Sequence, residues 1–268
     1  MKQTWMIASG KGGVGKSTLA AALAVALARA QQETVLVDMD IGLRSLDIHL
    51  GMENNVVYDV LDYVHGDCKL MQAVLAHTFQ PHLALLPAAQ LGSTAEIDSA
   101  YMQKIFRKLA KHYAYILADA PAGLENGVEK ILQGTENMLL VVTPDDVSIR
   151  DAERMIALCR EKGKPSPMLV VNRVHPALVQ SGDMYTPQVV ADTLDTPLLG
   201  YVPEDTEVLR ALARHQTVMD TDCPARHAMD RIARRLMGYT VPMPDVWQKP
   251  QEKKRGLFKR RERRGEQA

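Results

Sequence analysis

Nine consecutive residues near the N-terminus have the types and spacing of a phosphate-binding loop. They are Gly10, Lys11, Gly12, Gly13, Val14, Gly15, Lys16, Ser17 and Thr18, which match the pattern G-x-x-x-x-G-K-[ST]. The four glycines let the backbone fold so that its N–H groups point at phosphate oxygens. We expect Lys16 to reach the β- and γ-phosphates of ATP and the Ser17 hydroxyl to ligate Mg²⁺. A glycine-rich turn without a ligand is the alternative, but a predicted strand before the loop and a predicted helix after it favour the phosphate site.

Three aspartates stand at the ends of apolar runs of strand length. Asp38 and Asp40 follow residues 34–37, and Asp119 follows residues 113–118. A nucleotide site needs carboxylates to hold the waters of Mg²⁺ and to orient the attacking water. Each aspartate alone has a simple alternative as a helix cap or a loop charge. Their order after a phosphate loop favours the catalytic interpretation, most clearly for Asp40 and Asp119.

Short apolar runs alternate with helical patterns along most of the chain. We predict strands at residues 5–8, 34–37, 83–86, 113–118, 138–142, 168–171 and 198–202, and helices at 16–30, 56–64, 95–112, 147–162, 187–194, 207–215 and 224–237. Near-continuous apolar strands separated by helices indicate an α/β fold with a parallel sheet covered on both faces. We therefore expect a single P-loop NTPase domain at residues 1–238, with a mostly parallel twisted sheet of about seven or eight strands and helices on both faces.

The composition changes after Gly238. Pro242, Pro244 and Pro250 make residues 239–251 a predicted linker. Residues 252–268 hold eight Lys or Arg and three Glu, a net charge of +5 in a chain whose formal net charge is zero. A mildly acidic body with a basic tail predicts a partner that binds the tail, and it disfavours unaided DNA binding by the body.

The cysteines and the apolar segments indicate the compartment in which the protein works. Cys68, Cys159 and Cys223 are far apart and form no CxxC pair, which argues against a disulfide framework, a zinc site or a shared electron-transfer cluster. The N-terminal apolar run is too short for a signal peptide, and the sequence contains no apolar stretch of transmembrane length. We expect a cytoplasmic protein.

The phosphate loop resembles that of the MinD/ParA family of deviant Walker A ATPases. The resemblance rests on the hexapeptide from Lys11 to Lys16 and on the D-x-P-A-G pattern that begins at Asp119. It implies that Lys11 reaches across an ATP-dependent homodimer to the partner's nucleotide, as an arginine finger does. It also implies that Asp40 positions the attacking water, that Asp119 holds Mg²⁺ through water, and that Asp38 lies farther back around the metal.

The same resemblance predicts the base-binding residues. Asn172 follows the predicted strand 168–171, and Asp205 lies just beyond the predicted strand 198–202. In the family these strand ends frame the adenine, and the Asn amide reads the base edge. Turn chemistry is the alternative for both residues, because Asn and Asp are common in loops.

Further segments are similar to the MinD branch of the family. They are residues 40–47, 56–59, 148–151 and 203–210, together with the tail segment 253–260. The similarity implies reversible peripheral binding to the cytoplasmic face of the inner membrane, a MinC-like septum inhibitor as partner, and a MinE-like activator. Ser45 and Ala120 depart from the family, which usually has Asn and Ser there. These departures bear on the implied contacts with an activator and not on nucleotide binding.

The tail segment 253–260 resembles the family's membrane-targeting helix, and the resemblance implies binding to anionic inner-leaflet lipids. Burial of Leu257 and Phe258 would contribute about 3–6 kcal/mol at most, and each nearby basic residue about 1 kcal/mol. The basic residues are Lys253, Lys254, Arg255, Lys259 and Arg260. Arg261 and Glu262 replace the second apolar pair of the family's helix, so we expect binding that depends on charge and is lost at high salt.

Three alternatives to the membrane ATPase remain open. The tail could be a disordered, solubilising segment. The chain could instead be a ParA-like ATPase that partitions DNA or cargo, or a related ATPase that places flagella. We expect no direct contact with nucleic acid, and liposome pelleting against DNA gel shift, with and without ATP, separates these functions.

Overall fold

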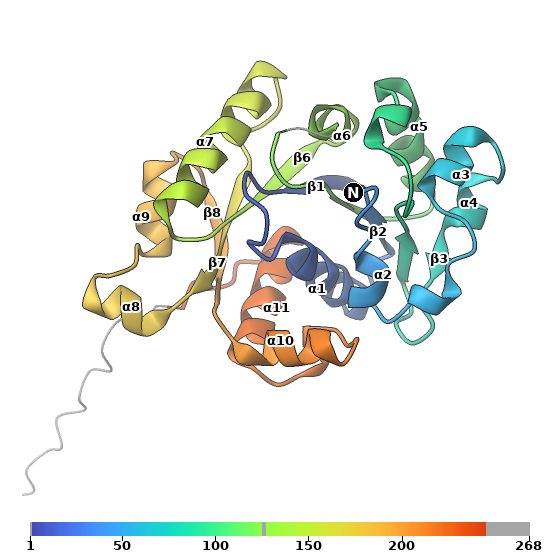
Figure 1. Ribbon diagram of the computed structural model, residues 1–268. Coiled ribbons are helices and arrows are strands. Elements are labelled where there is room, and N and C mark those ends of the chain that lie inside the picture. Colours follow the sequence, from blue (N-terminus) through green and yellow to red (C-terminus); the bar gives the residue numbers. More distant parts are fainter. Residues whose placement is uncertain (1, 125–126, 245–268) are drawn as a thin grey trace, which may run out of the picture.

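The computed structural model describes residues 2–124 and 127–244. In this part of the chain one sheet of eight strands has the order β3-β4-β2-β5-β1-β6-β7-β8. Every neighbouring pair is parallel except β3 and β4, which are antiparallel. The predicted α/β fold with a mostly parallel sheet is confirmed (Figure 1).

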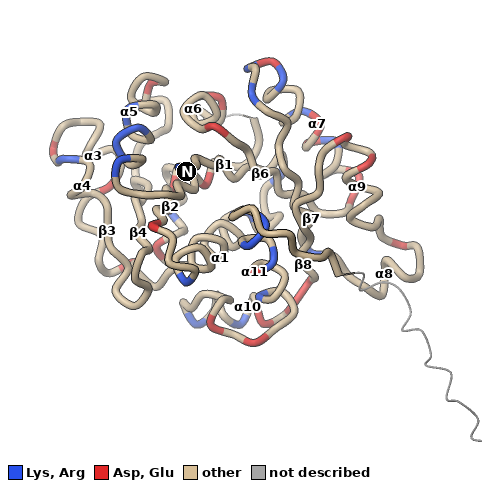
Figure 2. Tube along the Cα trace, turned by 180° about the vertical axis from the view of Figure 1, so that it is seen from behind, with Lys and Arg blue, Asp and Glu red and all other residues tan. Residues whose placement is uncertain are grey.

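The strands are short and almost wholly buried. Their bounds are Gln3–Ala8 (β1), Thr34–Asp38 (β2), Leu75–Ala76 (β3), Leu83–Leu86 (β4), Tyr115–Asp119 (β5), Asn137–Val142 (β6), Met168–Val174 (β7) and Leu198–Pro203 (β8). Charged residues lie mainly on the surrounding helices and loops (Figure 2). This distribution is expected for a sheet that packs against helices on both faces.

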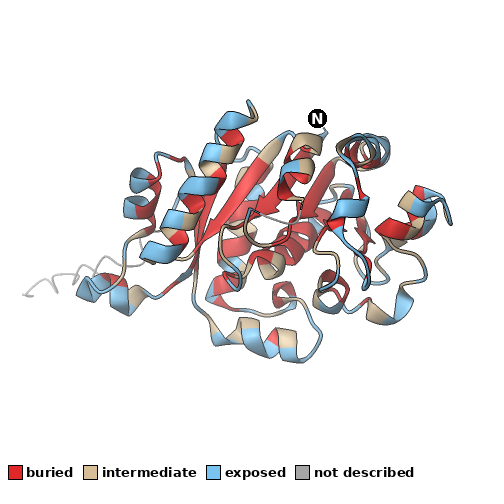
Figure 3. Cartoon of the chain, turned by 45° about the horizontal axis from the view of Figure 1, so that its top comes forward, coloured by how far each residue is buried: buried red, intermediate tan, exposed pale blue. Residues whose placement is uncertain are grey.

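The helices form two layers around the sheet. Their bounds are Lys16–Arg29 (α1), Leu46–His49 (α2), Val60–His65 (α3), Leu70–Ala73 (α4), Ser99–Leu109 (α5), Val128–Gly134 (α6), Asp146–Glu161 (α7), Pro176–Ser181 (α8), Pro187–Thr193 (α9), Thr206–Ala213 (α10) and Pro224–Leu236 (α11), with 3₁₀ turns at Glu53–Asn55, Thr94–Glu96 and Val218–Asp220. One apolar cluster joins the sheet to α1 and α11, and the other joins it to α3, α5, α6, α7 and α9. Buried residues accordingly line the strands and the inward sides of the helices (Figure 3).

Helix α1 carries the phosphate loop at its N-terminus and lies deep in the molecule. Its segment from Leu19 to Ala28 is buried along its whole length. Small alanine side chains let the helix pack closely between the sheet and α11. The phosphate loop is therefore continuous with a helix that is packed along its whole buried length.

Two predicted helices begin later than their periodicity indicates. Asp59 caps α3 by accepting hydrogen bonds from Leu61 N and Asp62 N, so the helix starts at Val60 rather than at residue 56. Asp98 accepts from Tyr101 N and starts α5 at Ser99 rather than at residue 95. An aspartate at the N-cap satisfies a free backbone N–H, which fixes the first turn.

A partly buried histidine holds the turn before β4. His77 Nδ1 accepts hydrogen bonds from the backbone N–H groups of Phe79 and Gln80, both at 3.1 Å. Its Nε2 lies 3.1 Å from the Leu50 carbonyl oxygen, just beyond α2. A nitrogen that accepts twice carries no proton, so the ring is neutral and Nε2 is the donor. Burial lowers the pKa of His77, against smaller opposing effects of the Leu50 carbonyl and Asp220.

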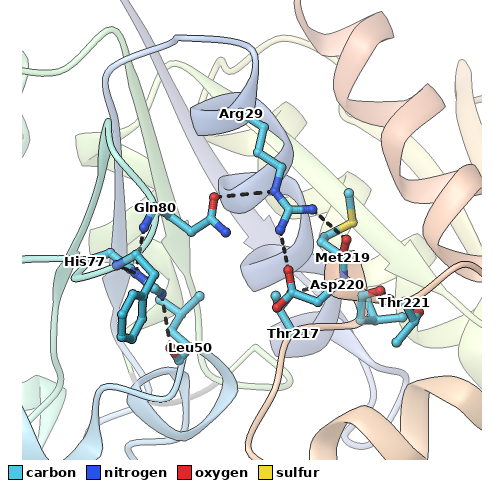
Figure 4. A network of polar contacts seen from close by, with 10 residues as sticks. Arg29, Leu50, His77, Gln80, Thr217, Met219, Asp220 and Thr221 are labelled. Atoms are coloured by element: carbon cyan, nitrogen blue, oxygen red, sulfur yellow. Dashed lines mark hydrogen bonds and ion pairs between the residues drawn. The ribbon is translucent and has the colours of Figure 1, made fainter.

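The same region fastens the end of α1 to the 3₁₀ turn Val218–Asp220 (Figure 4). The Arg29 guanidinium donates to the Met219 carbonyl at 2.6 Å and pairs with the Asp220 carboxylate. Its Nε donates to Gln80 Oε1 at 3.4 Å. The far end of α1 is thus tied both to the turn before β4 and to the segment that precedes α11.

The first part of the predicted linker lies against the domain. Arg235 donates to the carbonyls of Val241 and Pro242, and the Tyr201 hydroxyl donates to the Pro244 carbonyl at 2.6 Å. Residues 239–244 contain no helix or strand, as the prolines predict. The remainder of the predicted linker and the whole predicted tail, 252–268, lie outside the described residues. No helix in the described part of the chain has the length and apolar character needed to cross a membrane.

Candidate nucleotide-binding site

The predicted phosphate loop connects β1 to α1, and two of its glycines are required by close contacts. Gly15 is the N-cap of α1 with a φ of +88°, and a Cβ there would lie 2.4 Å from Asn172 Nδ2. A Cβ on Gly10 would lie 2.6 Å from backbone atoms of Asp151 in α7. Any larger residue would displace these neighbours. The loop therefore forms a tight backbone cradle at a helix N-terminus, which is a favourable place for an anion.

Lys16 and Asp119 form a buried ion pair at the base of the loop. Lys16 Nζ lies 2.7 Å from Asp119 Oδ1, and both side chains are buried. The same Nζ is 3.4 Å from the Ser17 hydroxyl oxygen. Asp119 reaches this position because it ends β5, which pairs with β1. The structure thus brings together three of the residues that the sequence assigns to phosphate and metal.

Asp38 uses both carboxylate oxygens to organise the chain after β2. Oδ1 accepts from Asp40 N at 3.0 Å, and Oδ2 accepts from Ser45 N and Leu46 N, both at 3.1 Å. Burial, and then the neighbouring Asp119 charge, raise its pKa to about 7, although the three backbone bonds act in the opposite direction. Asp38 therefore holds the segment 40–46 in place, and its expected position behind the metal stays a prediction.

Asp40 is half-buried and carries a carboxylate near the buried ion pair. Burial raises its pKa, the Lys16 charge lowers it, and the Asp119 charge raises it again. These electrostatic effects place Asp40 near both members of the pair. Its predicted role in orienting an attacking water stays a prediction.

The donor set fits a small, hard divalent cation that is shared with phosphate. Asp119 Oδ2 is buried and has no hydrogen-bond partner, and Asp38 is its direct neighbour across the β2–β5 pair. Within the described residues no group of three or more His, Cys, Asp or Glu side chains is arranged to hold a metal by itself. A cation here would need oxygen ligands from Ser17, phosphate and water, which is the arrangement that Mg²⁺ favours.

A cavity of about 310 Å³ adjoins the loop at the ends of β7 and β8. Asn172 and Asp205 both line it, but each side chain also has a structural contact. Asn172 Nδ2 donates to the Val14 carbonyl at 2.7 Å, so the amide supports the loop. Asp205 caps α10 through Glu207 N and also accepts from Ala225 N, so both its oxygens are engaged. Both side chains therefore make the structural contacts expected of loop residues, which was the alternative interpretation. Direct base recognition stays a prediction.

Lys11 lies at the mouth of the site rather than inside it. Its Nζ is 3.5 Å from Asp145 Oδ1, and the two side chains are 42% and 43% exposed. Asp145 also accepts from the Thr143 hydroxyl and caps α7 through Ser148 N. Burial opposes the ionisation of Asp145, but these bonds and the Lys11 charge outweigh it and lower its pKa. Lys11 is accessible from outside the subunit, although it is directed to a residue of its own chain.

Several residues of the site have no local sequence signal. Asp145 pairs with Lys11 across more than a hundred residues, so local spacing does not predict the pair. Only the position of Asp145 after β6, at a strand end, indicates that it could lie near the site. Arg173 has a φ of +57° and lines both the 310 Å³ cavity and an adjoining cavity of about 340 Å³. Leu209, Leu212 and Met229 supply an apolar wall. The predicted membrane residues Lys253, Lys254, Arg255, Leu257, Phe258, Lys259 and Arg260 lie outside the described residues.

Comparisons with known proteins agree with this geometry. Residues 5–218 match the CobQ/CobB/MinD/ParA nucleotide binding domain. The chain is 38% identical over 259 residues to the septum site-determining protein MinD of Helicobacter pylori, which covers 94% of this chain and 95% of the relative. Among solved structures it resembles the MinC:MinD cell division protein complex of Aquifex aeolicus (TM-score 0.84, 36% identity, 90% and 98% coverage). It also resembles the septum site-determining protein MinD from Pyrococcus horikoshii complexed with Mg-ADP (TM-score 0.79, 26% identity, 88% and 96% coverage).

Proposed function

The chain belongs to the MinD/ParA family of nucleotide-binding proteins, and we propose that it is a MinD-type ATPase that helps to position the division site. The observation that carries the proposal is the pair of lysines on one loop. Lys16 is buried against Asp119, whereas Lys11 is exposed at the mouth of the same site. One lysine serves the subunit's own nucleotide and the other is available to a twin subunit.

In the proposed complex the loop from Gly10 to Thr18 surrounds the phosphates of ATP. Lys16 leaves Asp119 and turns to the β- and γ-phosphates, and Ser17 holds Mg²⁺ together with water bound by Asp119. When bound, Mg²⁺ supplies neutralisation of the charge on the phosphate oxygens. The adenine occupies the 310 Å³ cavity beside Asn172, which adjoins the loop through Gly15 and Thr18. Nucleotide binding itself is supported by the relative whose structure is named as a complex with Mg-ADP.

Hydrolysis in this proposal uses Asp40 to orient the attacking water. The raised pKa of Asp40 reflects a partly desolvated carboxylate, which is a stronger hydrogen-bond acceptor than a fully hydrated one. Lys11 from the twin subunit adds positive charge to the phosphates, so hydrolysis and dimer formation are linked. Lys11 must first leave Asp145, and this exchange is inexpensive because both side chains are partly exposed.

Membrane binding is the proposed consequence of the dimer. One tail with Leu257 and Phe258 is a marginal anchor, whereas two tails on one dimer raise avidity by roughly 10²–10⁴. ATP binding then recruits the protein to anionic lipid, and hydrolysis releases it. The likeness to a MinC:MinD complex supports a septum inhibitor as the recruited partner. The alternative of DNA or cargo partition has less support, because a ParA family ATPase structure from Chlorobium tepidum is only 22% identical to this chain and shares the fold alone.

The test combines the dimer and the membrane in one experiment. Light scattering should show a dimer with a non-hydrolysable ATP analogue and Mg²⁺ and a monomer with ADP. Lys11→Ala should still bind the analogue but stay monomeric, whereas the exposed Lys111→Ala serves as a matched control and should dimerise. A chain that stayed monomeric when saturated with the analogue would refute the proposal.

A second assay separates membrane from DNA. Vesicles with phosphatidylglycerol should pellet the full chain with ATP and not a chain truncated after residue 251. Binding should fall steeply between low and high salt, because the tail carries five net positive charges. ATP-dependent DNA gel shift without vesicle binding would favour the partition function instead.

A further inference from the structure

His49 connects the phosphate-loop helix to the segment that follows β2. Its Nε2 lies 3.3 Å from the Thr18 hydroxyl oxygen, at the start of α1. Its Nδ1 lies 2.8 Å from the Ser45 carbonyl oxygen, at the other end of the short helix α2. The two contacts come from one ring, so Thr18 and Ser45 are held at a fixed separation.

The chemistry of the two partners sets the direction of both hydrogen bonds. A carbonyl oxygen can only accept, so Nδ1 carries the proton and donates to Ser45. In the neutral ring Nε2 is then an acceptor, and the Thr18 hydroxyl must donate to it. Thr18 has one hydroxyl proton, and that proton is committed to His49.

The residue that carries this hydroxyl also lines the cavity proposed for the nucleotide. Thr18 lines the 310 Å³ cavity together with Gly15 and Asn172. Phosphate and ribose ring oxygens accept hydrogen bonds and do not donate them. A phosphate or ribose ring oxygen that meets the Thr18 hydroxyl therefore competes with His49 for its one proton. His49 and Thr18 also border a small cavity, whose other lining side chains, such as Val208 and Leu212, carry no charge.

The other end of the link reaches the catalytic segment. Ser45 N and Leu46 N donate to Asp38, and Asp38 also accepts from Asp40 N. Movement of α2 is thus passed to the backbone of Asp40 through a short series of hydrogen bonds. We propose that His49 is a positioning residue that reports nucleotide occupancy from Thr18 to the segment 40–46, and this rests on the proposed function as an ATP-binding protein.

The competition predicts an unusual effect on affinity. His49→Asn keeps a donor for the Ser45 carbonyl but removes the acceptor for Thr18, so the hydroxyl is free for the nucleotide. ADP should then bind about two- to tenfold more tightly, as expected for one hydrogen bond. His49→Gln places an amide oxygen near Thr18 and should restore the wild-type affinity. In a Thr18→Val background, His49→Asn should not change the affinity for ADP.

The experiment is isothermal titration of ADP and Mg²⁺ into the wild type and four variants. These are His49→Asn, His49→Gln, Thr18→Val and the double variant Thr18→Val with His49→Asn. The half-exposed Ile48→Ala is the matched control on α2. A merely structural His49 predicts weaker binding by His49→Asn in both backgrounds, and that result would overturn the inference. Hydrogen exchange gives a second readout: ADP should speed exchange at Ser45 and Leu46 in the wild type but not in His49→Phe. An unchanged ADP response in His49→Phe would also overturn the inference, while leaving ATP binding intact. Failure of the wild type to bind ADP would instead refute the proposed function.

Discussion

Replacement of Asn172 by alanine tests whether its amide supports the phosphate loop or reads the base. Nδ2 donates to the Val14 carbonyl at 2.7 Å from a strand far away in the sequence. The same nitrogen occupies the space that a side chain on Gly15 would need. The amide is thus packed against two loop residues. Its removal should loosen the loop even when no base is present.

The size of the effect follows from the burial of the bond. Val14 and Asn172 are both buried, so the carbonyl loses its donor and gains no free access to water. A buried acceptor left without a partner costs about 1–3 kcal/mol. The free energy of unfolding of the nucleotide-free protein should fall by about that amount. Because the bound state needs the ordered loop, ATP and GTP affinities should fall together, by up to roughly 100-fold at 1.4 kcal/mol per tenfold.

Urea unfolding and nucleotide titration of Asn172→Ala measure both quantities. The exposed Asn54→Ala is a matched control that should change neither. The ratio of ATP to GTP affinity should stay at the wild-type value. An unchanged unfolding midpoint, with ATP binding lost and GTP binding kept, would refute the support role and establish base reading.

Three further outcomes follow from the contacts of the site and of the fold. Asp145→Asn keeps the cap of α7 and removes the charge that holds Lys11, so the ATP dimer should form at up to about fivefold lower protein concentration in sedimentation experiments; no change would show that Lys11 is not restrained. The pKa of His77 is lowered below its ordinary 6.5 by burial, so the unfolded chain binds a proton that the folded chain resists. The resulting stability is present above pH 6.5 and is lost as pH falls from there through the folded pKa; thermal unfolding of His77→Gln should show a smaller loss over this window, and an identical loss would assign it to other groups. Chelation of Mg²⁺ should weaken ATP binding by at least tenfold, because Asp119 then keeps Lys16; equal affinity in EDTA would contradict this exchange.

The sequence predicts the parts of the site that depend on local pattern. Glycine spacing and the flanking apolar runs are enough to place the loop between β1 and α1, and strand ends are enough to gather Asp38, Asp119 and Asn172 at one edge of the sheet. The reason is general, because parallel strands present their carboxyl ends at the same edge.

The missing parts depend on contacts between distant segments. The four-residue helices α2 and α4 are too short to show a helical period, and α2 exists where Asp38 accepts from Leu46 N. The antiparallel strand β3 has two residues and takes its conformation from β4. The family resemblance predicts Asn172 at the site, but its partner Val14 could not be read from spacing.

The charges of the site explain why nucleotide and cation should bind together. The buried ammonium group of Lys16 pairs with Asp119 and also acts on the charge of Asp40, while Asp38 is the neighbour of Asp119 across the β2–β5 pair. The pKa values of Asp38 and Asp40 are raised. Without nucleotide, Lys16 is the cation that neutralises Asp119. A triphosphate that drew Lys16 away would leave Asp119 buried beside Asp38 with no positive partner, which is costly in a site closed to water. A divalent cation arriving with the phosphates replaces the charge that Lys16 takes away, so Lys16 is free for phosphate only when the metal is present.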